Sequence, residues 1–193
     1  MGRVAGRSRA DTRDAILQAA AELVLEVGVN ATIAQIAARA GVSKGGVLYH
    51  FADKEALLVT LVTNEQEQFR AEVQAALDLD DTTPGRLTRA YVRAGLRPFT
   101  TGVGLSRQDA ELAARLSSIP AAQEAAARDA ERWEHDLAGD GLPTSSTTLI
   151  VCAVDGAAFS AFWGVQPSVA RMVELQDELL ALASRRGVAP PRG

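Results

Sequence analysis

Two short helical patterns lie next to each other between Thr32 and Lys54, and their spacing limits the folds open to this part of the chain. Thr32 begins the first pattern, and Gln35 stands three residues later, as in a capping box. The pattern stops at Gly41, and Ser43 is placed to cap a second, very short helix. Two helices joined by a short glycine-containing turn are typical of a helix-turn-helix, although many helical hairpins without a ligand share this pattern.

Helical patterns also flank this pair of segments. Apolar residues recur at three- and four-residue spacings from Thr12 to Val27, and Gly28 follows where a helix end favours glycine. Asp53 is placed to cap a fourth helix of about six turns. The sequence therefore predicts an all-α fold. The later segments with helical spacing are Arg86–Thr100, Gln108–Ser117, Ala121–Ala138, Thr147–Gly164 and Ser168–Arg186.

Composition agrees with closely packed helices. Hydrophobic residues make up 47% of the chain and aromatic residues only 5%, while alanine is abundant, which suits helices better than a β-sandwich. The 193 residues suffice for one large domain or two small ones that share a core. The single cysteine, Cys152, cannot form an internal disulfide, and Met1–Arg13 lacks the apolar core of a signal peptide. We therefore expect a cytoplasmic protein.

One segment has nearly the length of a membrane-spanning helix. Thr147–Val165 contains nineteen residues and one charge. That charge, Asp155, lies near the middle, where an ionised carboxylate is costly in lipid, and no basic cluster flanks the segment. We expect a helix that protein buries on most faces, with no membrane contact.

The charge distribution along the chain is compatible with nucleic-acid binding. Residues 1–54 carry seven Lys or Arg against five acids, a net +2, whereas residues 55–193 carry −6, which gives −4 for the chain. A mildly positive segment on an acidic body is the asymmetry that a small DNA-binding module would show.

The residue types between Thr32 and Lys54 suit DNA. The free N–H groups at a helix start attract phosphate, and Lys44 can reach a guanine edge or a phosphate. Gly45 and Gly46 each cost about 1 kcal/mol relative to alanine in a helix, which is tolerable if their missing side chains let the helix approach the groove. The predicted DNA-contacting residues are Thr32, Ser43, Lys44, Gly45, Gly46, Tyr49, His50 and Lys54.

The residues from Thr32 to Leu58 resemble the N-terminal signature of the TetR/AcrR family of transcriptional regulators. The resemblance covers roughly residues 10 to 60, and beyond them it is one of length and helical character only. The family often has an aromatic residue where this chain has Leu48, so we expect Leu48 to pack inward and Tyr49 to contact phosphate. The positions that match the family pattern are Ala37, Ala40-Gly41-Val42-Ser43, Tyr49-His50-Phe51 and Lys54-Glu55.

The resemblance implies two domains. Residues 1–55 would form an N-terminal arm and a three-helix helix-turn-helix DNA-binding domain, joined to a larger helical effector-binding and dimerisation domain at residues 56–193. Gly2–Arg13 would be an arm that contacts DNA or, equally, a solubilising tail. The residues at positions of family DNA contacts are Thr32, Lys44, Gly46, Tyr49, His50 and Lys54.

The resemblance also implies a function. We expect a ligand-responsive transcriptional regulator, a repressor rather than an activator, that binds a palindromic operator as a homodimer and is released by a small-molecule effector. Small residues recur every four residues within Thr147–Gly164, so this helix and Ser168–Arg186 could supply a four-helix interface between two subunits, the alternative being burial within one subunit.

The acidic, apolar body suggests an uncharged lipophilic or a cationic ligand as the effector. Apolar side chains spread over several helices could line its pocket, although residues of this kind are more often ordinary core. These candidate effector-binding residues are Tyr91, Phe99, Leu112, Leu116, Trp133, Phe159 and Trp163.

An enzyme and a helical adaptor protein are the two alternatives to a regulator. The chain has two histidines, His50 and His135, and lacks a zinc-protease motif, a G-x-S-x-G motif and a dinucleotide-binding glycine pattern, so we expect no enzyme and no cofactor. Asp78, Asp80 and Asp81 lack the spacing of a calcium loop, so we expect no metal. A helical adaptor protein that does not bind DNA remains an alternative. Absent or salt-insensitive binding to duplex DNA would favour this alternative.

Overall fold

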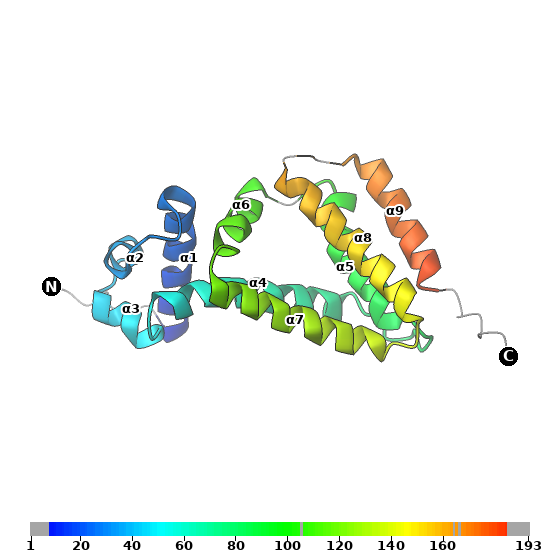
Figure 1. The fold of residues 1–193 in the computed structure, drawn as a ribbon, viewed down its shortest axis with the longest axis horizontal. Coiled ribbons are helices and arrows are strands. Elements are labelled where there is room, and N and C mark those ends of the chain that lie inside the picture. Colours follow the sequence, from blue (N-terminus) through cyan, green and yellow to red (C-terminus); the bar gives the residue numbers. More distant parts are fainter. Residues whose placement is uncertain (1–7, 105, 164, 166, 185–193) are drawn as a thin grey trace. The chain divides into compact units, whose positions relative to one another are not determined.

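The computed structural model describes residues 8–184 except 105, 164 and 166, and this part of the chain contains nine helices and no strand (Figure 1). The predicted all-α fold is confirmed. The predicted arm before Ser8, Gly164 and the end of the last predicted helix lie outside the described residues. The helices are α1 (Arg9–Val27), α2 (Ile33–Ala40), α3 (Lys44–His50), α4 (Lys54–Ala75), α5 (Arg86–Thr100), α6 (Arg107–Leu116), α7 (Pro120–Ala138), α8 (Thr144–Phe162) and α9 (Val169–Leu182).

The chain divides into two compact units. Residues up to Glu65, together with Glu111–Ala127, form the first unit. Gln66–Ala110 and the residues from Arg128 onward form the second. Since α4, α6 and α7 each cross a division point, three continuous helices contribute residues to both units.

Helix ends in the first unit follow the signals in its sequence. The side chain of Thr32 accepts a hydrogen bond from the Gln35 amide, and the Gln35 side chain accepts one from the Thr32 amide, so the predicted capping box is confirmed. Gly41 ends α2 with φ 69°, a left-handed conformation that few other residues adopt readily. Ser43 then caps α3 through a 3.0 Å bond from the Gly46 amide. These ends force the sharp change of direction between α2 and α3.

The first helix begins earlier than its apolar pattern indicates. Ser8 caps α1, and its side chain and that of Asp11 form a capping box, so the helix starts at Arg9 rather than at Thr12. The basic residues Arg9 and Arg13 are therefore helical and not part of an extended arm.

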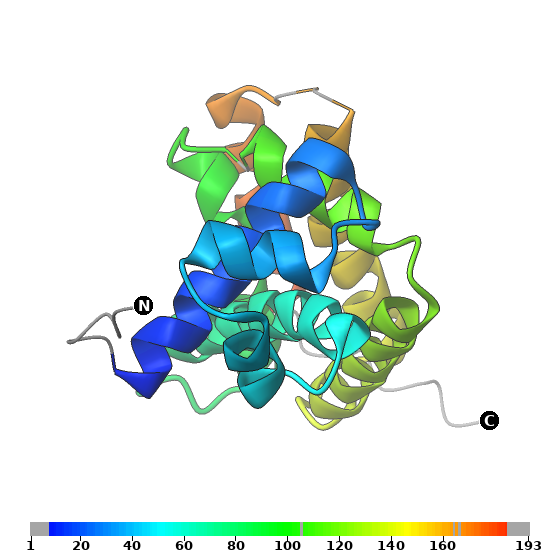
Figure 2. The ribbon, with the colours of Figure 1, turned by 90° about the vertical axis from the view of Figure 1, so that its left-hand side faces the viewer.

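One apolar core holds the first unit together, and α2 crosses α1 closely (Figure 2). Arg39 of α2 also forms ion pairs with Glu22 and Glu26 of α1, but these groups are exposed and such pairs contribute little. The fully buried side chains of this core are Ile16, Ala20, Val24, Ile36, Val47 and Leu57.

Residues 111–127 join this unit through a specific polar contact. Arg115 donates a 3.1 Å hydrogen bond from Nη1 to the carbonyl oxygen of Val24, in the last turn of α1, and Leu116 is buried in the same core. A cation at a helix C-terminus is favourable because the last carbonyls carry partial negative charge.

In the second unit, α5 packs against both α8 and α9, and the three helices run side by side in Figure 1. Gly95 permits the close crossing of α5 and α8, because a Cβ at this position would overlap Cγ1 of Val154. The N-terminus of α5 is capped by a distant residue: Asp140 accepts hydrogen bonds from the amides of Leu87 and Thr88 at 3.0 and 2.7 Å.

A buried arginine fixes the ends of α5 and α9. Arg89 donates to the Ala183 carbonyl at 2.6 Å, just beyond α9, and to the Asp81 carboxylate in the loop before α5. Hydrogen bonds from Thr83, and then from Arg89, hold the pKa of the Asp81 carboxyl well below its usual range. Arg89 thus joins the loop before α5 to the end of α9.

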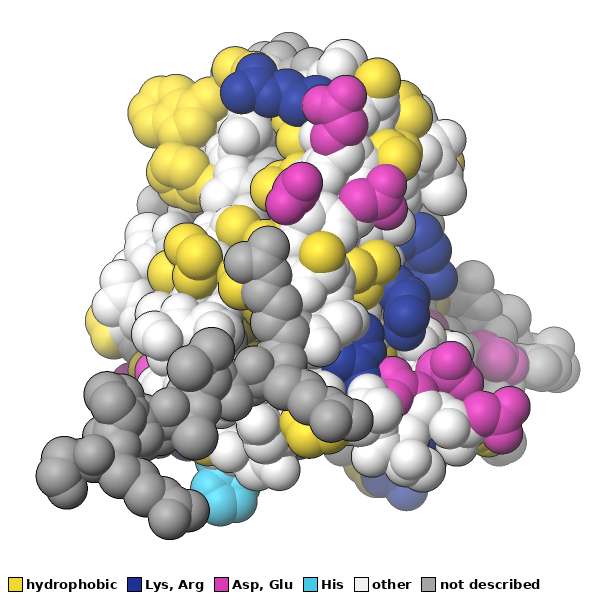
Figure 3. Space-filling view, turned by 90° about the vertical axis from the view of Figure 1, so that its right-hand side faces the viewer, with side chains coloured by type: hydrophobic (Ala, Val, Ile, Leu, Met, Phe, Trp, Pro, Cys, Tyr) yellow, Lys and Arg dark blue, Asp and Glu magenta, His cyan; other side chains and the backbone are white. Residues whose placement is uncertain are grey.

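Within one chain, α8 is buried on one side only. Ala157 packs in the core, whereas the neighbouring Gly156 is exposed. Phe159 is 59% and the following Trp163 71% exposed. Figure 3 shows hydrophobic side chains exposed beside acidic ones on one face of the molecule. No helix in the described part of the chain is long and apolar enough to cross a membrane.

Candidate nucleic-acid interface and effector region

The orientation of α3 is set by two buried side chains. Val47 and Phe51, four residues apart, occupy the inner side and pack in the core of the first unit. Leu48 is 43% and Tyr49 68% exposed, so the expectation that Leu48 packs inward is wrong. Consecutive helical residues point about 100° apart, so Leu48 lies on the flank of a helix whose inner positions are already taken.

The glycine pair in α3 is not required by the fold around it. A Cβ at Gly45 would meet only the Ser43 hydroxyl oxygen at 3.9 Å, and one at Gly46 would meet the same oxygen at 3.4 Å and Val42 at 3.5 Å. Neither glycine has a positive φ. Because the chain itself has room for alanine at both positions, a requirement for glycine would come from outside the chain.

Two arginines of α1 lie against aromatic residues in α3 and at its C-terminal end. The guanidinium of Arg9 lies 5.2 Å from the ring centroid of Tyr49, and that of Arg13 lies 5.2 Å from the ring of Phe51. Tyr49 and His50 also make an edge-to-face contact at 5.3 Å. Arg9 and Arg13 thus add two cations beside α3. The sequence showed them only as part of a basic segment, because their contact with α3 depends on tertiary packing.

All eight predicted DNA-contacting residues belong to the first unit, and the side chains of Thr32, Ser43 and Lys54 already have hydrogen-bond partners there. The Thr32 hydroxyl is held in its capping box. Lys54 Nζ donates a 3.0 Å hydrogen bond to the Val29 carbonyl in the turn between α1 and α2. An ammonium has three donors, so Lys54 both fixes this turn and keeps donors for a phosphate.

The structure does not bring the seven predicted effector-binding residues together. Tyr91, Phe99 and Trp133 share the core of the second unit, whereas Leu112 and Leu116 belong to the core of the first. Phe159 and Trp163 contact each other on the exposed side of α8, with ring centroids 6.3 Å apart.

An aromatic cluster in the second unit includes a residue that the sequence did not single out. Phe69 of α4, Tyr91 of α5 and Trp133 of α7 meet edge to face, with centroids 5.0 to 5.7 Å apart. The Tyr91 hydroxyl donates a 3.1 Å hydrogen bond to the Asp155 carboxylate on α8. Burial raises the pKa of Asp155 above its ordinary value, and burial followed by the charge of Asp155 raises the pKa of Tyr91.

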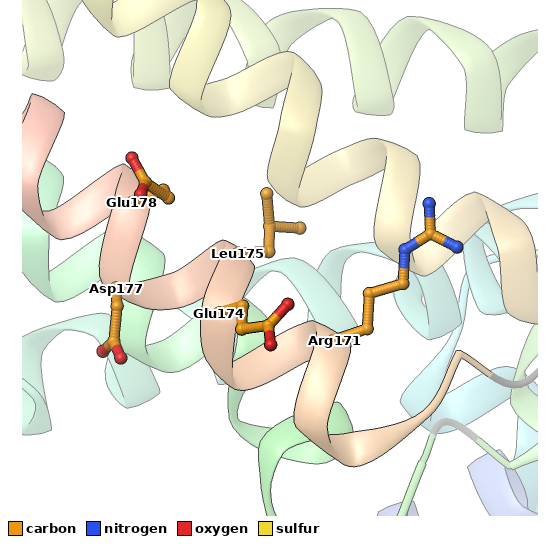
Figure 4. Close-up of a pocket in the computed structure, with 5 residues that line it drawn as sticks. All are labelled: Arg171, Glu174, Leu175, Asp177 and Glu178. Atoms are coloured by element: carbon orange, nitrogen blue, oxygen red, sulfur yellow. The ribbon is translucent and has the colours of Figure 1, made fainter.

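A separate hollow of about 480 Å³ follows α9 (Figure 4). It is open and is lined from this one helix, so it lacks the converging side chains of an enclosed ligand site. Its lining residues are Arg171, Glu174, Leu175, Asp177 and Glu178.

Comparison with known proteins identifies the class. Residues 16–61 match the family described as "Bacterial regulatory proteins, tetR family". Residues 85–184, more than half of the 193, match "Tetracyclin repressor-like, C-terminal domain". The chain therefore belongs to the TetR family of transcriptional regulators, as the resemblance in residues 10–60 predicted. The families matched are regulators and not enzymes.

Individual relatives match parts of the chain. The HTH-type transcriptional repressor BepR of Brucella suis biovar 1 (strain 1330) is 33% identical over 93 residues, 48% of this chain and 44% of BepR. The HTH-type transcriptional regulator BetI of Cronobacter sakazakii (strain ATCC BAA-894) is 42% identical over 66 residues, 34% of this chain and 33% of BetI. The chain thus matches less than half the length of either relative.

Solved structures match nearly the whole chain. A TetR-family member from Streptomyces coelicolor A3 superposes with a TM-score of 0.67 at 24% identity, over 88% of this chain and 98% of that one, and shows the shared fold. The multidrug binding protein EbrR complexed with malachite green gives a TM-score of 0.66 at 26% identity, over 88% and 96%.

Gly45→Ala and Gly46→Ala test whether the glycines serve DNA contact. Each change should raise the free energy of unfolding by about 0.5–1 kcal/mol, since alanine favours the helix and has room. Operator affinity should fall about tenfold or more, because the methyl group keeps α3 away from the groove. Thermal denaturation and fluorescence anisotropy with labelled DNA measure the two effects.

Gly139→Ala, beyond the end of α7, is the control and should leave DNA affinity unchanged. Raised stability with full operator affinity in both α3 variants would show that neither glycine has a role in binding.

Proposed function

We propose that this chain is a repressor that binds a palindromic operator as a homodimer and is released by a small-molecule effector. The observation that carries the proposal is the outer surface of α3, where Lys44 and Tyr49 stand exposed beside two glycines that the fold does not need. Membership of a family of transcriptional regulators and the repressor name of BepR support it. We place its action in the cytoplasm, where an operator is accessible.

In this proposal residues 1–55 are the DNA-binding domain, and the second helix of the helix-turn-helix enters the major groove. Lys44 contacts a guanine edge or a phosphate at the start of α3, and Tyr49 donates to a phosphate. Arg9 and Arg13 add phosphate contacts from α1. Since the glycines leave few side chains to read bases, DNA shape carries much of the specificity.

Residues 56–193 form the effector-binding and dimerisation domain. Exposed residues recur on one side of α8 at three- and four-residue spacings, and α9 exposes Val169 and Val173. Monomers rarely leave a contiguous apolar stripe uncovered, and a second copy would cover it with its own α8 and α9. This stripe, which we call the α8 stripe, comprises Leu149, Cys152, Gly156 and Phe159 of α8 and Trp163 directly after it.

Release follows from an equilibrium. A dimer binds the operator when its two α3 helices are spaced to match successive turns of DNA, about 34–36 Å or a multiple. An effector that prefers another arrangement shifts this equilibrium by the difference between its affinities for the two states. EbrR, which has the same fold, is solved with a bound organic dye, and this supports a small-molecule effector here.

Anisotropy titrations against DNA from beside the gene, at several salt concentrations, test the proposal. The native chain should bind its operator at least about 1000-fold more tightly than a scrambled duplex. Lys44→Ala and Tyr49→Ala should each weaken operator binding about tenfold or more, and Lys44→Ala should lower the salt slope by about one.

Arg132→Ala removes an exposed arginine of the second unit and should bind as the native chain does. Circular dichroism checks that each variant is folded. Operator binding no tighter than scrambled DNA at every salt concentration, or native affinity in both α3 variants, would refute DNA binding through α3.

Leu149→Glu tests the α8 stripe. In the proposed dimer the substitution buries one glutamate from each subunit against an apolar partner, which should raise the dimer dissociation constant about 100-fold or more. Operator affinity should fall as well, because the α3 helix of a monomer contacts only one half-site. Leu79→Glu is the control, since Leu79 is 82% exposed in the loop between α4 and α5. Sedimentation velocity distinguishes the monomer from the dimer. A Leu149→Glu protein that stays dimeric would place the dimer interface elsewhere.

A further inference from the structure

The aromatic cluster of Phe69, Tyr91 and Trp133 gathers three rings from three helices in the second unit. Their centroids lie 5.2, 5.7 and 5.0 Å apart, and Tyr91 and Trp133 are buried. Aromatic faces carry partial negative charge, and they attract cations most strongly where water is excluded. Such a cluster is therefore a favourable surface for a positive group with apolar substituents.

The protein already places a cation on this cluster. The guanidinium carbon of Arg70 lies 4.1 Å from the ring centroid of Trp133. Arg70 is held there by hydrogen bonds from Nε to Asp129 at 2.8 Å and from Nη1 to Asp136 at 2.9 Å. One ring of the cluster thus contacts a positive charge in the structure itself.

Asp155 adds a carboxylate on the other side of Tyr91. Its oxygen Oδ1 accepts the Tyr91 hydroxyl at 3.1 Å, and none of the ion pairs found among the described residues includes Asp155. Burial raises the pKa of this carboxyl, which means that its charged form lacks full compensation. Asp155 is exposed in the single chain, so its carboxylate is not sealed inside the core.

The charged residues around the cluster determine which sign of ligand charge is favoured. Arg70 faces two acids, Asp129 and Asp136, and Arg132 approaches Asp129 at 3.7 Å while pairing with Glu67. These contacts balance the acids on the Trp133 side and leave Asp155 without a cation. A neutral or anionic ligand would bury Asp155 further without pairing it, at a cost in free energy.

We propose that a lipophilic organic cation binds between Asp155 and the Phe69–Tyr91–Trp133 cluster, its charge facing the carboxylate and its apolar groups the rings. The class includes quaternary ammonium and phosphonium ions and delocalised aromatic amines. The proposal rests on the proposed function, because it takes the second unit as the effector-binding part. Since the three rings touch, the ligand must separate them, and this repacking distinguishes the bound state from the free one.

Tetraphenylphosphonium and tetraphenylborate are the probes, because they match in size and shape and differ in the sign of their charge. Quenching of Trp133 fluorescence reports binding in a Trp163→Phe background, in a sodium buffer that keeps both ions soluble. Tetraphenylphosphonium should bind at least about tenfold more tightly than tetraphenylborate, as expected for a partly desolvated cation between a carboxylate and aromatic rings.

Three further variants locate the site. Asp155→Asn keeps a group that can accept the Tyr91 hydroxyl, and it should weaken phosphonium binding about tenfold without weakening borate binding. Phe69→Leu should weaken phosphonium binding about threefold, the lower range of a cation–π contribution. Asp177→Asn makes the same charge change on the exposed side of α9 and should alter neither affinity.

Equal affinity for the two ions, or unchanged phosphonium affinity in Asp155→Asn, would overturn the cation site. Operator binding is measured without either ion on the native chain, which keeps Trp163. If specific operator binding is present while the ion results fail, the repressor proposal stands and only the ligand class is wrong. If operator binding is absent, the repressor proposal fails independently of the ion results.

Discussion

The burial of Val47 and Phe51 fixes how α3 is rotated about its own axis, and the function proposed here depends on that rotation. Both side chains pack in the core of the first unit, and burying each contributes about 1.5–3 kcal/mol. With these two inside, Lys44 and Tyr49 must face outward on a helix of only seven residues. A shift of one residue would bury Leu48 and move every outward side chain by about 100°.

Long-range polar contacts hold the rest of each unit in place. Arg115 bonds to Val24 at the end of α1, Asp140 caps the start of α5, and Arg89 joins the loop before α5 to the end of α9. Because α4, α6 and α7 contribute residues to both units, three continuous helices connect them. Phe69 and Trp133 lie on two of these helices, so the repacking that we propose on ligand binding would begin on elements shared with the DNA-binding unit.

Local signals in the sequence predicted much of the fold. The Thr32 capping box, the glycine that ends α2 and the caps of α3 and α4 were all visible, because each needs only neighbouring residues. The exposure of Leu48 was missed, since a helix as short as α3 contains too few residues to show its phase. The sequence of α8 is apolar on most sides, so its pattern could not show which side the chain leaves exposed. The contacts of Phe69 and Asp155 with Tyr91 emerged only from the tertiary structure, because these partners lie 22 and 64 residues away from Tyr91.

The most direct test of the account is the number of chains bound to one operator duplex, measured by sedimentation equilibrium with labelled DNA. Two chains should bind a palindromic duplex, because each of two α3 helices contacts one half-site. Binding to a duplex with one half-site scrambled should be weaker. A single chain on the intact operator, or equal affinity for the half-scrambled duplex, would contradict the claim that a symmetric pair of α3 helices recognises DNA.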